Sequence, residues 1–243
     1  MAADPTYNLT ALADRLGVEG RLPALAGKIR RARELHSLHT DLVMALESVA
    51  ALDNLLLAPT DLSDHGKMIT ESALLNNAIL LYARATKTAS DERKGFDPRP
   101  RFDERQKAIH RELCDLRDAA IAHFGSGGVY SGEWQAELSI LQFRGEDAKV
   151  AVVTRRQTVD KGLVKRVRAQ IEAALPHFRD AYLGSLDELT DALQLEADTN
   201  ADFSDEIGQH PLNLALFMKS EQAADEARRS FDSEHARGAV AHS

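Results

Sequence analysis

Apolar residues recur at helical spacing over the first part of the chain. After a short helix around residues 9–16, the segment from Pro23 to Ala58 carries apolar residues at alternating intervals of three and four positions. This a/d pattern predicts one long helix that ends near Pro59 and packs against a neighbouring helix of a bundle. The residues of this seam are Leu35, Leu38, Leu42, Ala45, Val49, Leu52 and Leu56.

Two further helices follow in the pattern. Ser63 is a suitable N-cap for a second helix that runs to about Ala89. Residues 90–102 combine a glycine, two prolines and mixed charge, so we expect an exposed, basic loop there. From about Asp103 a third helix carries an apolar stripe and ends with Gly125 as its left-handed cap. The stripe consists of Ile109, Leu113, Leu116, Ala120 and Phe124.

Beyond the glycines at 125–128 the periodicity changes. The segments ELSILQF and KVAVVT alternate or are β-branched, and RGEDA between them predicts a turn. Helical spacing returns from Asp160 to about Leu195, where Pro176 is expected to kink or break the helix. Pro211 is placed to begin a last helix, and we expect the final residues to fray.

These patterns predict a mainly α protein, an up-and-down helical bundle with an inserted β-hairpin at about 134–156. The composition agrees, because 44% hydrophobic residues suffice for a sizeable core and an aromatic content of only 5% favours helix over sheet. We expect residues 1–198 to form the bundle domain and residues 199–243 to form a C-terminal helix with a frayed acidic and alanine-rich tail.

The charge distribution limits the partners of this chain. A formal net charge of −8 argues against wrapping duplex nucleic acid over a broad surface, because positive charge drives such binding. Residues 155–168 nevertheless hold six Lys or Arg against one Asp, and residues 180–206 hold nine Asp or Glu without Lys or Arg. A local basic groove and two solvated helix faces of opposite sign are both consistent with this asymmetry.

Cysteine usage and the apolar runs indicate the compartment. The sole cysteine, Cys114, excludes a disulfide within the chain, and the first residues lack the pattern of a signal peptide. The longest apolar runs fall far short of the roughly 20 residues that a membrane span needs. We therefore expect a cytoplasmic protein that does not cross a membrane.

One motif carries residues suited to catalysis. The segment LRDAAIAHFGSGG places Arg117, Asp118 and His123 at the end of the third predicted helix. Other Arg–His pairs of similar spacing occur in the chain, but among the arginines of these pairs only Arg117 is followed directly by a polar Asn, Asp or His. RNA supplies its own nucleophile, so its cleavage needs a proton shuttle near neutral pH and a fixed cation. Histidine and arginine suit these two tasks.

The segment LRDAAIAH resembles the LRNKxxAH form of the motif that recurs in the HEPN superfamily (higher eukaryotes and prokaryotes nucleotide-binding), and the resemblance extends over residues 25–125. It implies a HEPN-like helical bundle and a metal-independent endoribonuclease, an RNA hydrolase that forms a 2′,3′-cyclic phosphate. Arg117 and His123 are then the catalytic pair, and Asp118 orients Arg117 or the motif of a partner. Such proteins often act as toxins or in defence, which implies an antitoxin or regulatory protein as partner.

The resemblance also implies a homodimer, because HEPN ribonucleases commonly place two motifs face to face. Helix geometry supports this expectation: at about 100° per residue, Arg117 and His123 flank the apolar stripe on opposite sides. One regular helix cannot bring them together, so either a second copy supplies the missing member or the helix distorts at the glycines. A patch of His110, Cys114, Arg117 and Ile121 is the predicted dimer surface.

A non-catalytic role is the alternative interpretation. His123 in the last turn of a helix can bond the terminal carbonyls, and Arg117 can pair with a neighbouring carboxylate. The chain would then be a HEPN-like module that binds a nucleotide or a protein, and enzymatic activity remains an open hypothesis at this point.

Other constellations add little chemistry. Arg84 on the second helix is predicted to add a second cation to an RNA site. His36 and His39 lack the second Glu-x-x-His pair that a di-metal bundle requires, and one cysteine beside His110 cannot complete an ordinary zinc site. We therefore predict no metal and no cofactor.

Overall fold

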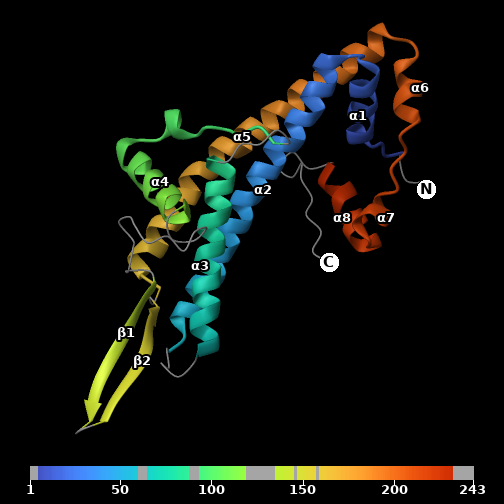
Figure 1. The fold of residues 1–243 in the computed structure, drawn as a ribbon. Helices are drawn as coiled ribbons and strands as arrows, with labels where there is room; N and C mark the ends of the chain where they lie inside the picture. The colour runs from blue at the N-terminus through green and yellow to red at the C-terminus, as the bar shows by residue number, and fades with distance from the viewer. Residues whose placement is uncertain are drawn as a thin grey trace. The chain divides into compact units, whose positions relative to one another are not determined.

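The computed structural model describes residues 5–59, 65–87, 93–118, 135–144, 147–156 and 159–231. These ranges contain eight α-helices and one antiparallel hairpin (Figure 1), which confirms the mainly α bundle with an inserted hairpin. The chain divides into two compact units. The terminal unit comprises residues 1–37 and 179–243, and the central unit comprises residues 38–178.

Helix α2 (Pro23–Leu57) follows the predicted heptad seam. Its seam residues from Leu35 to Leu52 are at most 4% exposed, and Leu56 near the helix end is partly exposed. Pro23 occupies the first helical position. A backbone N–H at this position has no acceptor within the helix, so the absence of one in proline costs no hydrogen bond. The prediction of a single long helix that ends close to Pro59 is confirmed.

Four helical segments build the central unit. They are the second part of α2, α3 (His65–Thr86), α4 (Glu104–Leu116) and the first part of α5 (Lys161–Thr199). The fully buried Tyr82 of α3 joins three of them, since its hydroxyl lies 2.9 Å from Nδ1 of His110 and accepts from Nε2 of Gln170 at 3.0 Å. Arg168 of α5 donates to Asp53 of α2, which closes the ring of helices.

Of the kink or break predicted at Pro176, the break is wrong, because helix α5 continues through this residue. A proline inside a helix removes one backbone hydrogen bond and costs about 3 kcal/mol. Ala174 and Phe178, on either side of it, are fully buried, and this packing offsets the loss. No helix within the described ranges combines the length and apolar character that a membrane span requires.

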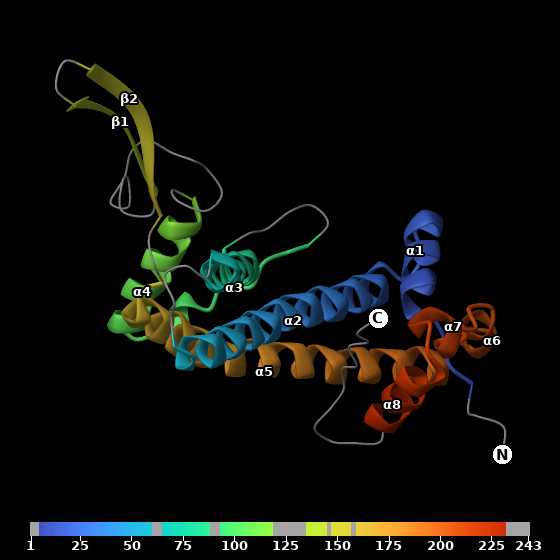
Figure 2. The same ribbon diagram turned by 90° about the horizontal axis from the view of Figure 1, so that it is seen from below.

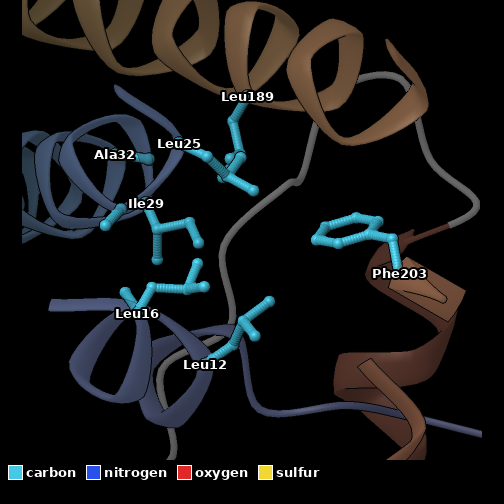
Figure 3. Packing of buried hydrophobic residues seen from close by; sticks show 9 residues of the cluster. Leu12, Leu16, Leu25, Ile29, Ala32, Leu189 and Phe203 are labelled. Atoms are coloured by element: carbon cyan, nitrogen blue, oxygen red, sulfur yellow. The ribbon is translucent and has the colours of Figure 1, made fainter. Parts of the chain in front are cut away.

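The terminal unit has its own apolar core. Helix α1 (Leu9–Glu19) begins at Asn8, whose side chain accepts from the N–H of Ala11, and ends at Gly20 in the left-handed conformation (φ +66°). Figure 3 shows side chains from α1, α2, α5 and α6 (Phe203–Gly208) converging on one cluster. Its buried members are Leu12, Ala13, Leu16, Leu25, Ala26, Ile29, Ala32, Leu189 and Phe203.

The C-terminal region contains three short helices in place of the single helix predicted from Pro211. They are α6, α7 (Leu214–Met218) and α8 (Glu221–Phe231), and Figure 2 shows them in the same region as α1. Pro211 does not begin a helix because it pairs with Tyr7 in an isolated β-bridge. The prediction is wrong because it used only local sequence, whereas Tyr7 lies at the opposite end of the chain.

The hairpin consists of β1 (Gln135–Arg144) and β2 (Asp147–Arg156), close to the predicted bounds. Its strands pair in one continuous antiparallel register. Both faces present exposed apolar pairs, Leu138 with Val153 on one and Leu141 with Val150 on the other. These side chains therefore contribute little to either apolar core.

Candidate functional site

Helix α4 begins as the sequence predicts. Asp103 and Gln106 form a reciprocal capping box: the Asp103 side chain accepts from the Gln106 N–H at 2.7 Å, and the Gln106 side chain accepts from the Asp103 N–H at 2.9 Å. The α-helical part ends at Leu116, and residues 117–118 continue as a π-helical turn. The step of about 100° per residue therefore stops at Leu116. The predicted continuation to Phe124 and the cap at Gly125 lie outside the described residues.

The structure brings two of the predicted site residues together. Nη1 of Arg117 donates to Oδ1 of Asp118 at 2.8 Å, and the ammonium of Lys87, directly after α3, donates to Oδ2 of the same carboxylate. Lys87 and Arg117, in that order, lower the pKa of Asp118 by these hydrogen bonds. All three side chains are between 35% and 45% exposed, so the cluster is accessible to a ligand. His123, the third predicted member of the site, falls outside the described part of the chain.

Arg84, the predicted second cation, is engaged elsewhere. Its guanidinium binds the buried carboxylate of Asp41 through Nε at 2.8 Å and through Nη2. Arg93 donates to the same carboxylate at 2.9 Å and to the carbonyl of Arg84 at 3.0 Å. This cluster fastens the start of the 93–102 segment to α2 and α3. Arg84 is not among the residues that line the cavity beside Asp118.

A cavity of about 740 Å³ lies within the central unit, next to the Arg117–Asp118–Lys87 cluster. Three stretches of chain form its wall: the end of α3, the segment 95–99 and one face of α4. Lys87 belongs both to this wall and to the cluster, and the wall residues Cys114 and Asp115 precede Arg117 and Asp118 by about one helical turn. The lining residues are Thr86, Lys87, Gly95, Phe96, Asp97, Arg99, Lys107, His110, Arg111, Cys114 and Asp115.

The cavity wall is positively charged on balance. It carries four cationic side chains and two carboxylates, a net charge of +2 with His110 neutral. Asp97 is neutralised by a bidentate pair with Arg99, with both N–O distances at 2.8 Å. Lys107 pairs with the highly exposed Glu104, and Arg111 forms no ion pair with a described residue. An anionic ligand therefore suits this cavity.

His110 forms part of the cavity wall as a neutral imidazole. The Tyr82 hydroxyl accepts from Gln170, so its own proton is free to donate to Nδ1 of His110. The ring proton then resides on Nε2, which lies 3.8 Å from Sγ of Cys114. Burial, followed by the positive charge of Arg99, lowers the pKa of His110. This histidine is therefore uncharged near neutral pH.

Cys114 and His36 add no reactive group to the described part of the site. Burial raises the pKa of the Cys114 thiol to about 11, so it stays protonated and weakly reactive near neutral pH. His110 and Cys114 are both buried in the central unit, so the predicted dimer patch that contained them is wrong. His36 packs against the ring of Tyr182, and the described residues contain no cluster of three or more His, Cys, Asp or Glu that could hold a metal ion.

Sequence reasoning did not find the cavity. One signal was present, because Lys107, Arg111 and Asp115 recur at intervals of four residues and thus share one helix face. The opposite wall depends on residues 95–99, whose position is set by contacts between distant residues. The rings of Phe96 and Phe178 form a T-shaped contact with their centres 4.7 Å apart, and Arg93 binds Asp41.

Comparison of this chain with protein-family models, with curated proteins and with solved structures finds no match. The candidate function therefore rests on the sequence motif around Arg117, the Arg117 cluster and the adjoining cavity.

Proposed function

We propose that this chain is a metal-independent endoribonuclease of HEPN type that cuts single-stranded or loop RNA. The observation that supports this proposal best is the position of Arg117: its guanidinium is partly exposed, is oriented by Asp118 and lies next to a positively charged cavity. A guanidinium in such a place can hold two oxygens of a phosphate while retaining its charge.

The proposed reaction is an internal transesterification. The 2′-oxygen of the ribose attacks the adjacent phosphorus while its proton passes to His123, and the bond between phosphorus and the 5′-oxygen breaks. His123 then gives this proton to the leaving 5′-oxygen, so that one histidine acts first as base and then as acid. Arg117 stabilises the negative charge that develops on the phosphoryl oxygens. The products are a 2′,3′-cyclic phosphate and a 5′-hydroxyl.

A homodimer is part of this proposal. It would combine Arg117 of one copy with His123 of the other, as the HEPN resemblance implies. The toxin or defence role, an antitoxin or regulatory partner and a cytoplasmic location belong to the same proposal and rest on the sequence alone.

One contact favours a second candidate, a non-catalytic HEPN-like module that binds a nucleotide or a protein. Arg117 and Lys87 are both paired with Asp118, so the cluster also serves to join the ends of α3 and α4. In this second candidate Arg117 stabilises the bundle and no bond of RNA is broken.

Purified protein incubated with mixed RNA in excess chelator separates the two candidates. The ribonuclease proposal predicts cleavage that falls at least about 100-fold in Arg117→Ala and in His123→Ala, because each removes a group acting in the transition state. Arg105→Ala is the matched control, since this exposed arginine lies on α4 outside the cavity. Cleavage that is equal in all four proteins indicates a contaminating nuclease and contradicts the proposal.

A further inference from the structure

We infer that the cavity is the groove that holds single-stranded RNA beside the scissile phosphate, with Lys107 and Arg111 binding backbone phosphates and Phe96 stacking against a base. This inference rests on the proposed ribonuclease function and assigns a substrate-binding role to residues outside the Arg117 motif.

The cavity follows one face of α4. Its α4 wall consists of residues 107, 110, 111, 114 and 115, a spacing of three and four that defines one face of the helix. Lys87 also lines the cavity, and its ammonium donates to the carboxylate of Asp118, which binds Arg117. A ligand that extends along this face therefore leads from Lys107 to the proposed catalytic arginine.

Two cationic side chains of α4 face the cavity. Lys107 and Arg111 lie four residues apart on this face, about 6 Å along the helix axis. Two cations at such a spacing can contact neighbouring phosphates of one strand. Arg111 has no ion-pair partner among the described residues, and the Glu104 partner of Lys107 is 86% exposed, so its ion pair is weak. Both cations are available to a ligand at little cost.

The cavity wall also contains an aromatic ring against which an RNA base can stack. Phe96 lines the cavity and is only partly buried, and the guanidinium of Arg101 lies 5.1 Å from its ring centre. Aromatic rings and cationic grooves are the two features by which proteins bind single strands without sequence preference. A volume of about 740 Å³ falls within the range of small-molecule sites and accommodates a nucleotide. Duplex RNA does not fit such a pocket.

Binding measured without cleavage tests the inference. A labelled single-stranded RNA of about 12 nucleotides is titrated with His123→Ala protein at several salt concentrations, with fluorescence anisotropy as readout. Adding Lys107→Ala or Arg111→Ala should weaken binding about five- to tenfold and reduce the slope of log K against log salt by about 0.7, the value for one phosphate contact. Adding Phe96→Leu should weaken binding about tenfold with the slope unchanged, and Phe96→Tyr should retain binding.

Arg105→Ala in the same background is the control, because it removes the same charge from α4 outside the cavity. If Lys107→Ala and Arg111→Ala bind RNA with the affinity and salt slope of this control while the unaltered chain cleaves RNA, the inference is overturned and the ribonuclease proposal stands. If the cavity variants lose binding but the unaltered chain never cleaves, the groove is supported and the ribonuclease proposal fails. Circular dichroism on each variant verifies that the helices are retained.

Discussion

The ammonium of Lys87, directly after α3, donates to the carboxylate of Asp118, directly after the α-helical part of α4. Asp118 accepts from Arg117 at the same time, so one carboxylate connects two cations from two elements. The contact lies where the regular α4 backbone gives way to a π-helical turn. Asp118 therefore fixes the orientation of Arg117 at a point where helix geometry alone no longer does.

Replacement of Asp118 by asparagine should lower the proposed ribonuclease activity more than it lowers stability. Loss of the carboxylate leaves Arg117 without its orienting partner, and misplacement of a catalytic group costs about ten- to a hundredfold in rate. The pairs with Lys87 and Arg117 are exposed to solvent, so the free energy of unfolding should fall by less than about 1 kcal/mol. Cleavage assays and urea denaturation measure the two effects. Full activity in Asp118→Asn would exclude the orienting role.

Asp41 should contribute more to stability than either arginine that it binds. Asp41→Ala removes the buried partner of both Arg84 and Arg93 and should lower the free energy of unfolding by about 2 kcal/mol. Arg84→Ala leaves Asp41 paired with Arg93, and the Arg84 side chain is half exposed, so we expect less than about 1 kcal/mol. Urea denaturation of both variants shows which of them loses more free energy of unfolding. A larger loss in Arg84→Ala contradicts this expectation.

The sequence predicted the parts of the fold that local periodicity determines. The seam from Leu35 to Leu52 is buried, α4 begins directly after Asp103, and the alternation around Leu138 and Val153 forms a hairpin. Periodicity reports which face of an element is apolar, and for these elements that information suffices.

The errors have a common physical cause, namely contacts between residues far apart in the sequence. Pro176 remains inside α5 because buried neighbours offset its lost hydrogen bond, and Pro211 is held by Tyr7. The same holds for the candidate site. The motif Arg117–Asp118 was recognisable, but the cavity depends on a segment positioned by the contact of Phe96 with Phe178.

His110 should make the stability of the protein depend on pH below neutrality. Burial lowers its folded pKa below the unfolded value of about 6.5, so the unfolded chain takes up a proton before the folded chain does. Stability is therefore complete above pH 6.5 and should decrease as the pH falls from about 6.5 toward 5.

His36 has a pKa lowered by burial as well, so only part of this dependence belongs to His110. His110→Phe should make the curve of unfolding free energy against pH shallower between about pH 5 and 6.5, whatever its effect on absolute stability. An identical slope in the variant would contradict a neutral, buried His110.

The hairpin should tolerate polar substitution without loss of helical stability. Phe143 is 70% exposed and Val150 is 74% exposed, so neither side chain contributes appreciably to an apolar core. Phe143→Ser and Val150→Ser should change the free energy of helix unfolding by no more than about 0.5 kcal/mol. Thermal melts followed by circular dichroism at helical wavelengths measure this. A loss above about 2 kcal/mol would mean that these side chains are covered in solution.

The central claim, a ribonuclease site shared by two copies, is tested most directly by mixing its two inactive variants. Arg117→Ala and His123→Ala are unfolded together, refolded as an equimolar mixture and incubated with RNA in excess chelator. A shared site predicts recovery of about one quarter of the unaltered activity, because half of the dimers are mixed and each retains one intact site of two. A mixture as inactive as its components, beside an active unaltered chain, would contradict the shared site. An inactive unaltered chain would contradict the ribonuclease itself.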